Sequence, residues 1–122
     1  MNPHMLTSEL QFIKEKIEKV TSSKFNSVLL NLYRDGNDSV DWHSDNEKEL
    51  NKKADIASVS FGVDRDFQIK SKNAGSKLEN INLKNGSLLI MSPPLQDYFI
   101  HRVPKRKKIL NSRINLTFRV ID

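Results

Sequence analysis

The stretch "RINLTFR", residues 113–119, alternates polar and apolar side chains. Neighbouring side chains of a strand point to opposite faces, so this stretch predicts a strand with one polar and one apolar face. The polar face carries Arg113, Asn115, Thr117 and Arg119. We expect the apolar face to lie in a core, with Ile114, Leu116 and Phe118. Paired arginines on such a strand favour carboxylate recognition, although a solvated outer face is the commoner explanation for any one strand.

The same alternation recurs near the start of the chain, where Asn31 and Tyr33 alternate with Leu30 and Leu32. Short strands are predicted at residues 27–33, 56–62, 66–71, 97–103 and on both sides of an Asn-Gly turn within residues 80–92. An Asp-Gly turn follows the first of them. Closely spaced strands without βαβ alternation predict a mainly β fold of the α+β class, a sandwich or jelly roll. We expect residues 1–122 to form a single domain.

One helix is predicted ahead of the strands, at residues 8–22. Ser8 and Gln11 indicate a capping box at its start. Its apolar side chains recur at steps of three and four and form one face, which predicts an element that packs on the sheets. These side chains are Leu6, Leu10, Ile13, Ile17 and Val20.

The composition of the chain bears on its partner, its possible metal ligands and its compartment. The net charge is +5, which favours a polyanionic partner. The chain has no cysteine, so a metal would be held by His, Asp and Glu, as suits iron, manganese, magnesium or zinc. The longest apolar run, "SLLIM", is too short to span a membrane. Glu9, Glu15 and Glu18 argue against a signal or transit peptide. We expect a monomer of the cytoplasm or nucleus with no membrane partner.

The stretch "WHSDNE", residues 42–47, holds the candidate catalytic and metal-binding residues. His43 and Asp45 share one face of an extended segment. His101 follows in a distant predicted strand, and the remaining histidine, His4, falls in the N-terminal segment. Two histidines and one carboxylate are the ligand set of the facial triad that holds non-haem Fe(II). A His-x-Asp pair alone is more often a turn or surface pair, so the triad is one of two interpretations. Trp42 either covers the metal site or packs in the core, and packing is the expected role of a lone tryptophan.

Taken in order, Asn31-x-Tyr33, "RDGNDSVDWHSDNE", "IASVSFG", "NGSLLIM", His101 and "RINLTFR" resemble the AlkB family of Fe(II)/2-oxoglutarate-dependent dioxygenases. The closest branch repairs alkylated DNA, and the resemblance runs from about residue 25 to residue 120. It implies a double-stranded β-helix, or jelly roll. It also implies that O2 and 2-oxoglutarate are consumed while N-alkylated bases such as 1-methyladenine and 3-methylcytosine are demethylated, with release of succinate and formaldehyde.

The resemblance also assigns roles to residues. His43, Asp45 and His101 match the iron ligands. Arg113 matches the arginine for the distal carboxylate of 2-oxoglutarate, with Tyr33 and Asn115 beside it. The positions expected near the other carboxylate or on the same face are Asn31, Arg119 and Thr117. Asn46 and Glu47 match positions that approach the damaged base. Asn46 departs from the acidic residue often found there, and because an amide can donate as well as accept, lesion preference is expected to differ.

The stretch "PKRKK", residues 104–108, carries four consecutive positive charges, Lys105, Arg106, Lys107 and Lys108. Such a run can be a solvated turn, but in this family it is similar to a loop that lies along the nucleic-acid backbone. We therefore expect alkylated DNA as partner, preferably single-stranded, with RNA as an alternative. An AlkB-type enzyme acting on RNA, tRNA or protein and a catalytically silent nucleic-acid-binding jelly roll stay open. Family members carry additional chain ahead of the motifs, which forms a lid, and we expect this chain to lack that lid.

Overall fold

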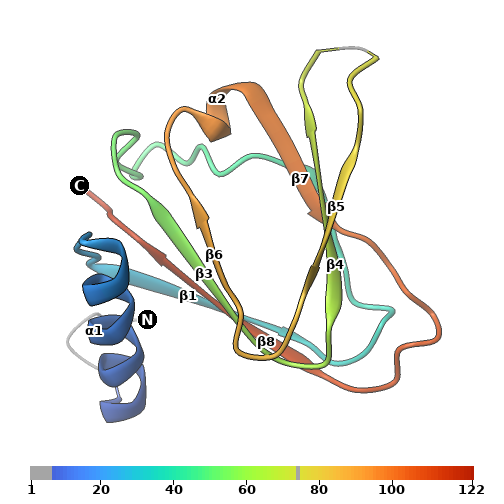
Figure 1. Ribbon diagram of the computed structural model, residues 1–122, viewed down its shortest axis with the longest axis horizontal. Helices are drawn as coiled ribbons and strands as arrows, with labels where there is room; N and C mark the ends of the chain where they lie inside the picture. Colours follow the sequence, from blue (N-terminus) through green and yellow to red (C-terminus); the bar gives the residue numbers. More distant parts are fainter. Residues whose placement is uncertain (1–6, 74) are drawn as a thin grey trace.

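Two four-stranded antiparallel sheets face each other in the computed structural model, which describes residues 7–73 and 75–122 (Figure 1). The first sheet has the order β1-β8-β3-β6 and the second β2-β7-β4-β5. Their bounds are β1 Ser27–Tyr33, β2 Val40–His43, β3 Ile56–Gly62, β4 Arg65–Ser71, β5 Glu79–Leu83, β6 Leu88–Met91, β7 Phe99–Val103 and β8 Arg113–Arg119. The helices are α1 Ser8–Thr21 and α2 Leu95–Tyr98. This arrangement agrees with the predicted jelly roll with an N-terminal helix.

Helix α1 covers the outer face of the first sheet (Figure 1). Ile17 packs there with Ala57 of β3 and Phe118 of β8, and both of these sheet residues are fully buried. Because Ala57 and Phe118 are directly paired across β3 and β8, the helix lies over the central strands of the sheet. The predicted packing role of this helix is therefore confirmed. No helix in the described part of the chain is long and apolar enough to cross a membrane.

The predicted details of α1 are partly wrong. Thr7, not Ser8, is the N-cap, because the Thr7 Oγ1 accepts the Leu10 N–H at 3.2 Å. The Gln11 side chain donates to Glu15 instead of returning to the cap. Val20 is 72% exposed and lies outside the packed face. The other predictions on this segment, Leu6 in the apolar face and His4 in the terminus, fall outside the described residues.

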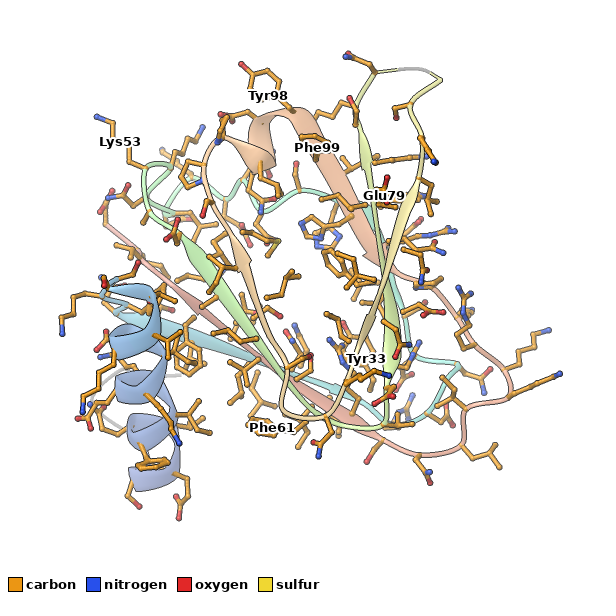
Figure 2. The ribbon with its side chains drawn as sticks, in the orientation of Figure 1. Tyr33, Lys53, Phe61, Glu79, Tyr98 and Phe99 are labelled. Carbon is orange, nitrogen blue, oxygen red and sulfur yellow. The ribbon has the colours of Figure 1, made fainter. Side chains whose placement is uncertain are left out.

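The main core lies between the two sheets. Its buried residues come from both of them: Tyr33, Ile56 and Met91 from the first, Phe67, Leu83 and Val103 from the second. Figure 2 shows Tyr33 in this interior and Phe61 near the lower end of the first sheet. The polar face of β8 also points inward, so the site described below shares this interior.

The apolar back of the first sheet is only half covered. Leu116 and Phe118 are buried beneath α1, as predicted. Ile114 is 39% exposed, so the prediction that it lies in a core is wrong, and Leu32, its partner on β1, is 55% exposed. A 14-residue helix is about 21 Å long and covers one end of the sheet. The strand ends that carry Ile114 and Leu32 extend beyond it.

Two local elements differ from the prediction. Residues 40–43 form β2, whose pairing with β7 was not anticipated from the sequence. Asp97 and Tyr98 belong to the single turn of α2, so the predicted strand at residues 97–103 begins at Phe99. Gly86 in the Asn-Gly turn has a φ of 80°, which a glycine adopts without strain and which confirms that turn.

Candidate active site

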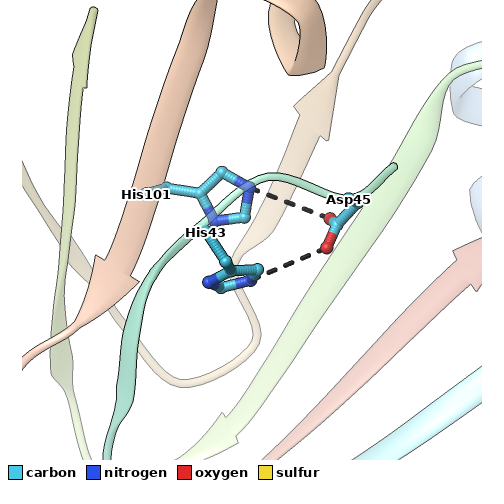
Figure 3. A group of neighbouring side chains, drawn as sticks. All are labelled: His43, Asp45 and His101. Carbon is cyan, nitrogen blue, oxygen red and sulfur yellow. Dashed lines mark ion pairs between the residues drawn. The ribbon is translucent and has the colours of Figure 1, made fainter. Parts of the chain in front are cut away.

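The predicted metal ligands converge at one point between the sheets (Figure 3). His43 of β2 and His101 of β7 are paired across the two strands, and Asp45 follows β2. The Asp45 carboxylate oxygens lie 3.6 Å from the His43 Nε2 and 3.8 Å from the His101 Nε2. Two metal bonds of about 2.1 Å each can bridge roughly 4 Å, so one ion fits among these atoms.

A β-bulge aims His43 at this point. Val40 pairs with Val103 and His43 pairs with His101, so β2 has one more residue than β7 between the two pairs. In a regular strand Val40 and His43 would face opposite sides, but the extra residue turns both toward the interior. Trp42 stands instead on the outer face, between the Lys70 ammonium at 4.3 Å and the Arg102 guanidinium at 4.6 Å. The expectation that Trp42 packs in the core is wrong.

Hydrogen bonding and burial prepare both histidines as neutral ligands. The His43 Nδ1 lies 2.8 Å from the carbonyl oxygen of Asp41, a contact that requires the ring proton on Nδ1 and frees Nε2 for a metal. Burial, together with the nearby His43, lowers the pKa of His101 to about 4. Burial raises the pKa of the Asp45 carboxyl, which means that its charged form gains from a neighbouring cation. Phe67 stacks on the His101 ring and fixes its plane.

A cavity of about 280 Å³ extends from these ligands between the two sheets. All six residues predicted for the cosubstrate line it: Asn31, Tyr33, Arg113, Asn115, Thr117 and Arg119. They come from β1 and β8, which are paired so that Asn31 lies opposite Asn115 and Tyr33 opposite Arg113. The polar faces anticipated on these two strands therefore form one continuous wall.

Arg113 is a buried cation with free hydrogen-bond donors. It is 2% exposed, and its Nη2 donates to the Ser60 Oγ at 2.9 Å. Its guanidinium lies 4.9 Å from the Tyr33 ring centroid. The Nε and Nη1 atoms have no partner within the described residues, and burial lowers the pKa of this arginine. A carboxylate in the cavity would satisfy these donors and supply the missing counter-charge.

Amide and hydroxyl groups complete the wall. The Asn115 Nδ2 donates to the Ser58 Oγ at 2.7 Å, and Thr117 donates to the Asn115 Oδ1 at 2.9 Å. Ser58 and Ser60 were not singled out from the sequence. The signal was present, because both serines alternate with apolar residues along "IASVSFG" and share the inward face of β3.

An ion pair stands at the edge of the cavity. The Arg119 Nη1 lies 3.3 Å from the Glu47 Oε1, and the Glu47 side chain is 52% exposed. The Nε of Arg119 is buried and has no partner among the described residues. Asn46, the other residue expected near the damaged base, lines a different and much smaller cavity of about 40 Å³ beside Ile56 and Pro94. The structure therefore brings Glu47, but not Asn46, to the main cavity.

Comparison with known proteins shows which family the chain belongs to. Residues 2–119 match the family model of the 2OG-Fe(II) oxygenase superfamily. The chain belongs to this superfamily. It is 40% identical to DNA oxidative demethylase ALKBH2 of Homo sapiens, in a match that covers 99% of this chain and 49% of that protein. Alpha-ketoglutarate-dependent dioxygenase alkB homolog 3 of Mus musculus is 44% identical, with 98% and 44% covered.

These relatives confirm the resemblance to AlkB proteins, and the chain spans about half of their length. A solved structure, that of OsALKBH1, overlays with a TM-score of 0.64 at 21% identity and covers 89% of this chain and 63% of that one. At that level of identity the overlay supports the fold alone.

The basic loop of this oxygenase chain lies outside the cavity, between β7 and β8. Lys105, Lys107 and Lys108 are exposed, whereas Arg106 pairs with Asp66 of β4 at 3.0 Å. Figure 1 shows the loop beside the turn between β1 and β2. Gly36 in that turn exchanges backbone hydrogen bonds with the loop, and a Cβ at this glycine would collide with the Arg106 carbonyl. The loop is therefore held in place while its three lysines stay free to meet an anion.

Proposed function

We propose that the chain is the catalytic core of an Fe(II)- and 2-oxoglutarate-dependent dioxygenase that demethylates N-alkylated nucleobases. The observation that carries this proposal is the placement of the buried, unpartnered Arg113 donors and the His-Asp-His triad in one cavity. An acid with two carboxylates fits such a site, because the arginine can bind one end while the metal holds the other. The relatives named DNA oxidative demethylase ALKBH2 support DNA as the substrate.

The donor set fits Fe(II). Two neutral imidazoles and one carboxylate on a single face suit this ion and leave positions open on its other side. His43, Asp45 and His101 would hold it. When bound, the iron and 2-oxoglutarate supply the oxidising chemistry: O2 is consumed, succinate and CO2 leave, and an N-methyl group becomes an unstable N-hydroxymethyl group that is released as formaldehyde.

Within this scheme the protein binds and orients the reactants. Arg113 would bind the distal carboxylate, while Ser60 holds the guanidinium in place and Tyr33 lies against it. Asn31, Asn115 and Thr117 line the same wall, and Arg119 would bind near the other carboxylate. The His43 Nδ1 faces the Asp41 carbonyl, so its Nε2 is the nitrogen that can bind a metal, and burial favours the neutral form of His101 by lowering its pKa.

Glu47 is the residue best placed to read a base, because its half-exposed carboxylate lies at the edge of the cavity. A carboxylate there can accept a hydrogen bond from an exocyclic amine, a group that 1-methyladenine and 3-methylcytosine share. The target base must leave its stack to reach the metal, which costs a few kcal/mol and least when the base is already unpaired. The proposal therefore favours single-stranded substrate. The exposed lysines of the basic loop contact phosphates, which DNA and RNA have in common.

An anaerobic titration tests the site. Addition of Fe(II) and then 2-oxoglutarate to the purified protein should produce the weak visible charge-transfer band of the chelate. Asp45→Ala should abolish the band, because the site loses its anionic ligand. A wild-type protein without the band would contradict the proposed site.

Strand preference is tested by repair of the same lesion in single and double strands at two salt concentrations. Equal rates on single and double strands would contradict the preference.

A further inference from the structure

Gln96 lies beside the three proposed metal ligands but belongs to none of the motifs that the sequence singled out. It stands in the single turn α2, between β6 and β7. Its Oε1 accepts the backbone N–H of Asp45, 51 residues away, at 2.8 Å. The same oxygen lies 3.2 Å from the His101 Nε2. Its amide nitrogen faces the Met91 sulfur at 3.5 Å, which orients the amide with its oxygen toward the ligands.

Asp45 needs such a contact more than the two histidines do. His43 and His101 stand on paired strands, so the ladder between β2 and β7 fixes their backbones. Asp45 follows the end of β2, in residues 44–47 that belong to no helix or strand. A carboxylate on irregular backbone can turn away from a metal unless another group holds it. The Gln96 oxygen supplies that hold through the Asp45 N–H.

We infer that Gln96 is a positioning residue of the metal centre, which keeps the Asp45 carboxylate turned toward the two imidazoles. The inference rests on the proposed function. Gln96 acts through Asp45 and is not assigned as a ligand. Only the hydrogen bond from the Asp45 N–H persists when a metal is bound, because a metal-binding His101 Nε2 carries no proton to donate to the Gln96 oxygen. The Asp45 backbone is thereby held in place before an ion enters.

The test is the affinity of the metal-free protein for Co(II), read from its visible absorption without 2-oxoglutarate. Gln96→Leu keeps a branched side chain of similar volume but removes the acceptor, and loss of a group that orients a metal ligand typically weakens metal binding by about 10–100-fold. Gln96→Glu keeps an acceptor oxygen at the same reach and should bind Co(II) at least as tightly as the wild type. Gln11→Leu is the matched control, since Gln11 stands on α1 and its side chain bonds only to Glu15 among the described residues.

A purely structural role predicts a different pattern. If Gln96 merely packs α2, Gln96→Leu will lower the thermal midpoint in EDTA while the Co(II) affinity stays that of the wild type, and this result would overturn the inference. Gln96→Glu binding as weakly as Gln96→Leu would overturn it too. Failure of the proposed metal centre itself would give a different result. The wild-type protein would then bind no Co(II), or it would bind Co(II) that His101→Ala does not abolish.

Discussion

Replacement of Arg113 by lysine tests how the cavity binds its cosubstrate. Arg113→Lys keeps one positive charge but removes the planar group that Ser60 and Tyr33 hold in place. The arginine is 2% exposed and its Nε and Nη1 have no partner in the described chain, so a bound carboxylate would be shielded from water. A hydrogen bond to a charged group is worth about 1.5–3 kcal/mol. Loss of one such bond corresponds to about a tenfold to hundredfold weaker affinity.

The assay is an anaerobic titration of the Fe(II)-loaded protein with 2-oxoglutarate, followed through the visible band of the chelate. Arg34→Lys is the matched control, because the Arg34 side chain is 79% exposed, pairs with Asp38 and does not line the cavity. We expect the dissociation constant to rise about tenfold to hundredfold for Arg113→Lys and to stay unchanged for Arg34→Lys. An unchanged constant for Arg113→Lys would show that Arg113 does not hold the cosubstrate. Equal losses in both variants would point to a general loss of structure.

Three further predictions concern separate parts of the molecule. Asp45→Ala should remain folded by circular dichroism but bind no Fe(II), and wild-type affinity in that variant would rule out the assigned ligands. Lys107→Ala with Lys108→Ala should lower the slope of log affinity against log salt for a single-stranded oligonucleotide by about 1.4, at 0.7 per lost phosphate contact; an unchanged slope would place the nucleic acid elsewhere. Arg34 holds the pKa of Asp38 at about 2, below its value of 3.8 in the unfolded chain, so this stabilisation is complete above pH 3.8 and lost as pH falls toward 2. Asp38→Asn should therefore lower the thermal midpoint at pH 7 but not at pH 2, and equal midpoints at pH 7 would refute this.

Strand periodicity was readable from the sequence because it is local. "RINLTFR" and "IASVSFG" coincide with β8 and β3, and the polar face of β8 lines the cavity as expected. The element that covers the opposite, apolar face of β8 comes from a distant part of the chain, and the sequence of the strand does not reveal it. Ile114 continues the apolar pattern of Leu116 and Phe118 but lies beyond the end of α1, and its exposure depends on where that helix packs.

Two features of the site depend on partners distant in the chain. The bulge that aims His43 inward is defined by the register of β2 against β7, and a run such as "VDWH" does not reveal it. Gln96 follows Pro93 and Pro94 in a stretch with no recognisable motif, and its contact with Asp45 appears only when the chain is folded. Motif order predicted the three candidate ligands, whereas the groups proposed to orient them required the structure.

The proposed demethylase activity is tested most directly by mass spectrometry of a single-stranded DNA oligonucleotide that carries one 1-methyladenine. The oligonucleotide is incubated in air with the protein, Fe(II) and 2-oxoglutarate, and Asp45→Ala serves as the control. We predict that the wild-type protein removes the mass of one CH2 group from the oligonucleotide and forms succinate and formaldehyde, while the variant leaves the mass unchanged. An oligonucleotide of unchanged mass after incubation with the iron-loaded wild-type protein would contradict the proposed demethylation.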